Sequence, residues 1–271
     1  MKRMLLWLSL LLLIGCTLSP LGRKQLKLLP DSQMNEMGLA AFQELKDSTP
    51  QSEDPQLRAY VICVADAVTA QAQDETGVAD WEVRVFKDDT PNAFALPGGK
   101  IGVHTGMFKV TENAAQLAAV IAHEVGHVIA AHGNERVSTA MTAELGLNLA
   151  ALLAKDKSPQ DRANLLNLLG VGAQVAVLLP YSRIQESEAD LIGLDMMAKA
   201  GFDPRESVQL WLNMMEQGGG GTPEFLSTHP SDQTRIEDLQ KRMPSALKLY
   251  ESARASGLRP TCTQPADAGG R

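Results

Sequence analysis

The sequence predicts a mainly helical α+β domain with one small β-sheet. Runs with helical periodicity cover most of the chain, whereas segments that alternate like strands are confined to residues 81–103. The hydrophobic content of 44% is mostly Leu, Ala and Val and the aromatic content is only 4%, which suits a helical core. The formal net charge of −7 argues against nucleic-acid binding and against a basic membrane-binding patch.

The first half of the chain predicts two helices and then the sheet. We expect helices at 33–46 and 55–73, separated by a loop that contains Ser, Thr and Pro. Residues 81–86 alternate as a strand, and residues 92–103 predict two short strands around the turn Pro97-Gly98-Gly99. An extended peptide can add to the edge of such a sheet through backbone hydrogen bonds. A purely structural hairpin is the alternative.

The second half predicts helices throughout. Residues 137–178 are helical in pattern, and within them residues 165–179 predict a buried helix, with an apolar surface that meets substrate or membrane as the alternative. Gly201 should end the preceding helix, and Asp203-Pro204 should begin the next. The run Gly218–Gly221 is interpreted as a solvent-exposed connector or as a mobile lid.

The most informative motif is His123-Glu124-Val125-Gly126-His127. Two histidines four apart lie on one face of a helix, one turn from each other, so both imidazoles can reach a single zinc ion. Glu124 is placed to take a proton from a water molecule that the metal activates. The surrounding run has a broad apolar stripe, and Thr111 is a plausible N-cap for it. A buried helix that carries these polar groups needs a partner, and a metal satisfies that need.

A second helix, expected after Pro180, offers the third ligand that a catalytic zinc requires. Glu186 and Asp190 are four apart and share a face, to which Arg183 also belongs, whereas Glu188 lies about 200° round the helix. We therefore predict Glu186 as the zinc ligand and Asp190 as the group that orients a ligand histidine. Arg183 is expected to pair with Asp190 or to hold the site together. Gly193 would let the two helices approach closely.

These motifs resemble one family of zinc metallopeptidases. HExxH is followed some sixty residues later by SRxxExEADxxG, as in the family that includes HtpX, the CAAX prenyl proteases and the periplasmic BepA-like and LoiP-like peptidases. Residues 92–103 resemble the strand–turn–strand before the family's active helix. His229-Pro230, with Arg235 six residues after the histidine, resembles its late HP…R element. The resemblance covers approximately residues 55–245.

The resemblance implies a zincin-like metallopeptidase domain that binds one zinc per chain through His123, His127 and Glu186, with Glu124 as general base. His229 would be a partner of the oxyanion, with Arg235 supporting its segment. Two other interpretations of His229 remain open. It can occupy the open zinc position and hold the enzyme latent, or the His-Pro pair can be a simple helix-start turn.

The beginning of the sequence is typical of a signal peptide. Lys2 and Arg3 precede an apolar stretch from Met4 to Ile14 that is too short to span a bilayer as a helix. Cys16 follows in the setting of a bacterial lipobox, so we expect it to be lipidated, with a plain secretory signal as the alternative. The expected boundaries are a signal peptide at 1–15, a lipid tether at 16–32, the metallopeptidase domain at 33–255 and a tail at 256–271.

Two further cysteines, Cys63 and Cys262, invite a disulfide in a secreted chain; the alternative for Cys63 is a buried apolar thiol. The expected location is a bacterial cell envelope, with a lipid anchor in the outer membrane and the protein facing the periplasm. The expected partners are unfolded or misfolded proteins as substrates, the membrane and envelope-assembly proteins.

The predicted function is a membrane-anchored zinc endopeptidase that cleaves unfolded or misassembled envelope proteins. The first alternative is a chaperone-like binding lipoprotein that keeps the zinc site for structure. Structural zinc sites have four protein ligands and are rich in cysteine, unlike the three ligands evident here. The second alternative is a zinc hydrolase that does not act on peptides.

Overall fold

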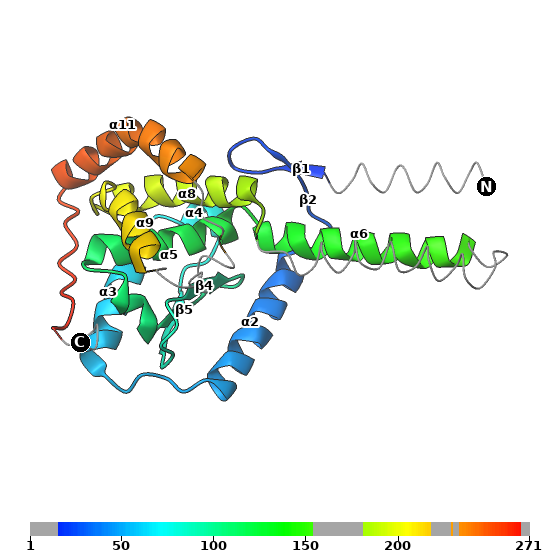
Figure 1. The fold of residues 1–271 in the computed structure, drawn as a ribbon, viewed down its shortest axis with the longest axis horizontal. Helices are drawn as coiled ribbons and strands as arrows, with labels where there is room; N and C mark the ends of the chain where they lie inside the picture. Colours follow the sequence, from blue (N-terminus) through cyan, green and yellow to red (C-terminus); the bar gives the residue numbers. More distant parts are fainter. Residues whose placement is uncertain (1–15, 154–180, 218–228, 230–232, 267–271) are drawn as a thin grey trace. The chain divides into compact units, whose positions relative to one another are not determined.

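The computed structural model describes residues 16–153, 181–217, 229 and 233–266 (Figure 1). Contacts divide the chain into two compact units, Met1–Pro30 with Ala131–Pro180, and Asp31–Ala130 with Tyr181–Arg271. Helices predominate in the described residues and the sheets are small, so the predicted mainly helical α+β class is confirmed. The expected signal peptide, the helix at 165–179 and the run Gly218–Gly221 lie outside the described residues.

The described part of the smaller unit is a hairpin followed by a segment that is bound to a helix. Strands β1 (Cys16–Leu18) and β2 (Lys24–Leu26) pair antiparallel, and the helix is α6 (His132–Leu153). Arg23 on the hairpin forms a two-pronged ion pair with Glu135 of α6, with N–O distances of 2.6 and 2.7 Å. The N–H of Leu28 then donates to Ser138 Oγ at 2.9 Å. Part of the segment 16–32, which we expected to be a lipid tether, therefore forms specific contacts with α6.

The larger unit carries the sheet and most of the helices. Its elements in chain order are α2 (Asp31–Ser48), α3 (Pro55–Thr69), α4 (Gln73–Thr76), β3 (Glu82–Phe86), β4 (Ala93–Leu96), β5 (Lys100–His104), the 3-10 helix η1 (Thr105–Lys109), α5 (Ala114–Ile129), α8 (Arg183–Lys199), α9 (Glu206–Gln217) and α11 (Gln233–Ala255). Among the described helices, none by itself has the length and apolar content to cross a membrane. Ala114–Ile129 and His132–Gly146 satisfy that test only as a bent pair.

The strands form a sheet of order β3-β5-β4, in which β3 is parallel and β4 antiparallel to β5. The predicted turn at Pro97-Gly98-Gly99 joins β4 to β5, and it needs both glycines because their φ angles are +81° and +74°. Buried Val83 and Val85 of β3 join the core, which α3 and α5 also line. This arrangement leaves β4 at one edge of the sheet.

Helices α5 and α8 cross with their backbones almost in contact, and Figure 1 shows α8 between α5 and α11. The crossing depends on two glycines. A Cβ added to Gly126 of α5 would lie 2.8 Å from the carbonyl oxygen of Ala189, and one added to Gly193 of α8 would lie 2.8 Å from the nitrogen of His123. Because these neighbours are backbone atoms, only glycine permits the approach that brings both helices to one site.

Two expected helix starts differ from the structure. The N-cap of α5 is Asn113, not Thr111, because the Asn113 side-chain oxygen accepts from the backbone N–H groups of Ala115 and Gln116 at 3.0 Å each. Helix α9 begins at Glu206 rather than at Pro204. The carboxylate of Asp203 accepts from the Arg205 backbone and side chain, which forms a separate turn before the helix.

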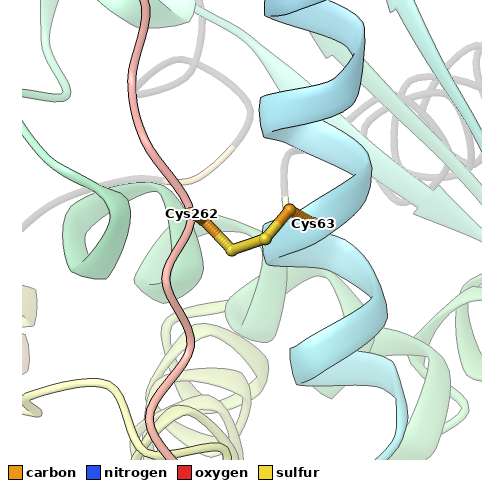
Figure 2. The surroundings of a disulfide bond; sticks show 2 residues. All are labelled: Cys63 and Cys262. Carbon is orange, nitrogen blue, oxygen red and sulfur yellow. A yellow bond between two sulfur atoms is a disulfide. The ribbon is translucent and has the colours of Figure 1, made fainter.

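The disulfide between Cys63 and Cys262 is present and joins α3 to the extended C-terminal segment (Figure 2). The two cysteines are 199 residues apart in sequence, and their Cα atoms are 5.7 Å apart. Gln264 adds two long hydrogen bonds, accepting from the Tyr60 hydroxyl and donating to the Thr111 carbonyl at 3.4 Å each. These bonds pin the segment after α11 against α3 and the start of α5.

Candidate metal centre

Helix α5 supplies three of the expected residues from its last two turns. His123, Glu124 and His127 are all buried, with exposed fractions of 4, 4 and 3%. The i, i+4 spacing brings the Nε2 atoms of His123 and His127 to 3.1 Å from each other. Both imidazoles therefore point at one location, as the motif predicts.

Helix α8 brings Glu186 to the same location. The helix begins with a capping box, in which the Ser182 hydroxyl accepts from the N–H of Gln185 and the Gln185 side chain accepts from the N–H of Ser182. Glu186 follows directly and is completely buried. Its Oε1 lies 3.4 Å from His127 Nε2, and its Oε2 lies 3.4 Å from His123 Nε2.

His229 supplies a fourth donor atom. Its Nδ1 lies 3.2 Å from His123 Nε2 and 3.0 Å from Glu186 Oε1. One donor atom from each of His123, His127, Glu186 and His229 can be chosen so that all lie within 4.8 Å of one another. For metal–ligand distances of about 2.0–2.1 Å, donors at the corners of a tetrahedron are about 3.3–3.4 Å apart. The separations between neighbouring donors, 3.0–3.4 Å, are close to this value, so the cluster can hold one zinc ion.

Glu124 lies beside this cluster with an unsatisfied oxygen. Its buried Oε1 has no hydrogen-bond partner within the described part of the chain, and it lies 3.6 Å from His229 Nε2. Burial raises the pKa of the Glu124 carboxyl, an effect that the imidazoles of His229 and His123 partly oppose. A buried carboxylate with a free oxygen and a raised pKa has the properties of a general base.

Asp190 orients His123, one turn after Glu186 on α8. Its Oδ1 lies 2.9 Å from His123 Nδ1, an arrangement that directs Nε2 of the same ring toward the other donors. Burial would raise the pKa of the Asp190 carboxyl, but the Arg235 guanidinium and the bond to His123 outweigh it and lower that pKa. Asp190 therefore stays ionised.

Arg235 of α11 links the parts of the site. Its Nε and Nη2 donate to the two oxygens of Asp190 at 2.6 and 2.8 Å. Its Nη1 forms an ion pair of 2.8 Å with Glu186 Oε2, although the angle is not that of a hydrogen bond, and it donates to the His229 carbonyl at 3.4 Å. The guanidinium also stacks over Trp211, 4.0 Å from the ring. One buried cation is thus shared by two buried carboxylates.

The structure places Arg183 outside this cluster. Arg183 is exposed at the first residue of α8, and the pairing with Asp190 expected of it is made by Arg235 instead. The physical reason is that α11 packs along α8 and brings its own arginine to the buried face. Helical spacing within α8 predicted that Arg183 lies on the same face as Asp190. It could not predict that Arg235 of another helix would pair with Asp190 instead.

Two aromatic residues of the site were missed by sequence reasoning. Trp211 stacks on Arg235, and Tyr181 lies with its ring centre 4.0 Å from that of His127 and 5.4 Å from that of His229. The position of Tyr181, directly before the N-cap Ser182, was an available signal that its side chain would be fixed. Trp211 belongs to the apolar face of α9, which predicts burial but not the guanidinium above it.

The donor set fits a catalytic zinc chemically. Neutral imidazoles and a carboxylate are normal zinc ligands, and the described part of the site contains no cysteine, the typical ligand of structural zinc. Three of the donors come from α5 and α8, whose relative position is fixed by backbone contact at two glycines. With a general base beside it, such a site can hydrolyse a polarised carbonyl compound.

Comparison with known proteins agrees with this geometry. The chain is 40% identical over 182 residues to the mitochondrial metalloendopeptidase OMA1 of Schizosaccharomyces pombe, covering 66% of this chain and 52% of that protein. It is 35% identical over 238 residues to OMA1 of Danio rerio (82% and 49%) and 30% identical over 217 residues to the beta-barrel assembly-enhancing protease of Yersinia pestis (76% and 43%). The chain thus spans about half the length of these relatives.

The comparisons correct the expected location of the protein and support only the wider of the two expected family assignments. The predicted location in a bacterial outer membrane is wrong, because the relatives that match at 37–40% identity are named as mitochondrial proteins of fungi and a plant. The particular likeness to HtpX and the CAAX prenyl proteases is not confirmed. The wider prediction of a zinc metallopeptidase family is confirmed.

The family itself follows from a match that covers most of the chain. Residues 51–243 fit the family model described as Peptidase family M48. This span contains the sheet, the crossing of α5 and α8, and every donor atom of the cluster. The chain belongs to peptidase family M48, a family of zinc-dependent metallopeptidases.

Proposed function

We propose that this protein is a zinc-dependent endopeptidase in which Glu124 is the general base. The proposal depends on the buried oxygen of Glu124, which has no hydrogen-bond partner among the described residues and lies beside a four-donor cluster. When bound, zinc polarises the scissile carbonyl and lowers the pKa of a water molecule to about 7. His123, His127 and Glu186 are the residues that would hold it.

The chain's own groups then handle the protons. Glu124 accepts a proton from the attacking water and returns it to the leaving amine, a task that its raised pKa favours near neutral pH. Asp190 accepts from the Nδ1–H of His123 and so leaves the Nε2 lone pair free for the metal. Arg235 pairs with both Asp190 and Glu186 and keeps Asp190 ionised. Burial would raise the pKa of Glu186, but its bonds to His123, His127 and His229 lower it.

The position of the His229 ring supports a latent resting state of the enzyme. Its Nδ1 lies among the metal-facing atoms while its Nε2 faces Glu124, so one imidazole covers both the fourth metal position and the base. A partner of the oxyanion would instead leave the fourth position open for substrate and water. We therefore propose that His229 is a latch that must move before a peptide can bind.

The proposed substrates are unfolded or misassembled proteins. Strand β4 lies at an edge of the sheet and packs beside α5, so an extended segment can pair with it through backbone hydrogen bonds. That mode selects for extended chain more than for particular side chains. Denatured casein should be cut, whereas the same amount of a stably folded protein should not.

The proposed place of action is a membrane surface. The support is the apolar sequence Met4–Ile14 followed by Cys16, a composition that favours partition into lipid. The test is flotation of the full chain with liposomes, compared with a Cys16→Ser variant and a variant that lacks residues 1–15. Recovery of all three with the soluble fraction would contradict membrane association.

The central test combines metal analysis with cleavage of casein. The protein should contain about one zinc per chain and lose activity to a chelator. Glu186→Ala should lose zinc, whereas Glu188→Ala should keep it. Glu188 is a matched control because it is also buried on the same helix but lies outside the donor cluster. Retention of zinc in Glu186→Ala would refute the site.

A second candidate function, a binding protein with a structural zinc, has one observation in its favour. Four protein donors already surround the metal position, as in structural sites. His229→Ala separates the two functions. A structural site predicts loss of zinc and of thermal stability, whereas the latch predicts that zinc stays and cleavage rises.

A further inference from the structure

The ring of Tyr181 lies against two of the four donor imidazoles. It is inclined by 31° to the ring of His127 at a centre distance of 4.0 Å and by 29° to that of His229 at 5.4 Å. The residue is half-buried. Nothing in the assigned roles of the donors explains why an aromatic residue stands there.

Local structure fixes Tyr181 in this position. The capping box of Ser182 and Gln185 sets the start of α8, and Tyr181 is the residue immediately before the N-cap. A hydrophobic side chain at that place often packs against a hydrophobic fourth helical residue, a contact known as the hydrophobic staple. In α8 the fourth helical residue is instead Glu186, a donor of the cluster. The ring of Tyr181 lies against the donor imidazoles of His127 and His229.

The two stacked imidazoles differ in how firmly they are held. His127 is fixed by α5, a helix that is buried along its length. His229 lies in a bend outside the described helices and strands, so no regular backbone hydrogen bonding fixes it as α5 fixes His127. Its ring lies against Tyr181, His123 and the carboxylates of Glu186 and Glu124. A stacking contact therefore contributes more to the position of His229 than to that of His127.

We propose that Tyr181 is a positioning residue that holds His229 in the closed site and sets how often the fourth metal position opens. This inference rests on the proposed function of His229 as a latch. Stacking of aromatic rings shifts such an equilibrium about three- to tenfold. The stacking contact is made by the ring, which Tyr181→Phe would keep.

The test compares Tyr181→Phe, which keeps the ring, with Tyr181→Leu, which removes it. Ile184→Ala is the control, since Ile184 lies in the same first turn of α8 with 65% of its surface exposed. Each zinc-loaded protein is mixed with excess chelator and the rate of zinc release is followed. Tyr181→Leu should release zinc about three- to tenfold faster and cut casein faster, whereas Tyr181→Phe and Ile184→Ala should match the wild type.

A double-mutant cycle with His229→Ala decides whether the effect passes through His229. Removal of the ring should change zinc release little when His229 is already absent. If Tyr181→Leu accelerated zinc release equally with and without His229, the proposal would be overturned. Tyr181 would then act on His127 or only shield the metal site from solvent. An unchanged rate in Tyr181→Leu alone would overturn it as well.

A measurement on the wild type keeps the proposal testable if Tyr181→Leu does not fold. The ring protons of His229, assigned by their loss in His229→Ala, should show an upfield ring-current shift in NMR spectra; an ordinary shift would refute the stack. Failure of the proposed function looks different. It would appear as absent zinc or absent cleavage. It would also appear if His229→Ala released zinc and cut casein like the wild type although the wild-type His229 protons show the ring-current shift.

Discussion

Replacement of Gly193 by alanine tests the backbone crossing on which the site depends. The added Cβ would lie 2.8 Å from the nitrogen of His123, 2.9 Å from the carbonyl carbon of Ala122 and 3.0 Å from its oxygen. Ordinary van der Waals contact begins at 3.4 Å, so α5 and α8 must separate by about 0.6 Å at this point. Backbone atoms of a buried helix cannot move aside as a flexible side chain would.

Separation of α5 and α8 at Gly193 would displace the metal ligands. Gly193 contacts the residue that bears one ligand imidazole, and Glu186 lies two turns before it on the same helix. Overpacking of this kind costs about 1–3 kcal/mol, and a misplacement of about 1 Å in an active site lowers catalytic rates about 100-fold. Gly193→Ala should therefore weaken zinc binding about tenfold or more and lower casein cleavage by at least as much.

The control is Gly146→Ala in α6, whose added Cβ would meet no atom of the described residues within 4 Å. Both changes raise helix propensity equally, by about 0.5–1 kcal/mol, so any difference between them reports the crossing. Zinc affinity is measured by competition with a chromophoric chelator, and stability by urea unfolding. The reasoning is refuted if Gly193→Ala binds zinc and unfolds like Gly146→Ala.

Four other predictions follow from the contacts of the site and of the disulfide. Glu124→Gln should abolish cleavage at unchanged zinc content. In the wild type, kcat/KM should fall as the pH drops through a pKa above the ordinary glutamate value of 4.5, because burial raises that pKa and the base must be ionised. Replacing Cys63 and Cys262 by serine should lower the free energy of unfolding, by at most about 5 kcal/mol for so long a loop. Arg235→Met should destabilise the fold by about 3–5 kcal/mol in urea, because Asp190 loses its buried cation; an unchanged midpoint would contradict this.

The local features of the site were predictable because they depend on short spacings. The pair His123 and His127 needs only helical periodicity to share a face, and the turn at Gly98 needs only the conformational freedom of glycine. The choice of Glu186 over Glu188 also followed from the angle between residues on one helix. The start of α5 was misplaced by two residues because Thr111 and Asn113 are both good N-caps.

Features that join distant segments were not predictable in the same way. Arg235, rather than Arg183, meets Asp190 because α11 packs along α8, and no spacing within α8 reveals that. Trp211 and Tyr181 reach the site through packing of α9 and through a helix cap, where the sequence signal is burial or position alone.

By itself, the sequence determined the chemistry of the centre: which side chains can hold a metal, which carboxylate can move a proton, and the helix that presents them. Those properties are local, because a helix repeats every 3.6 residues whatever surrounds it. Only the tertiary structure decided that His229 is a fourth donor, which cation pairs with the buried carboxylates and how closely α5 and α8 approach. These features depend on contacts between residues up to 106 positions apart, where packing and not periodicity sets the distances.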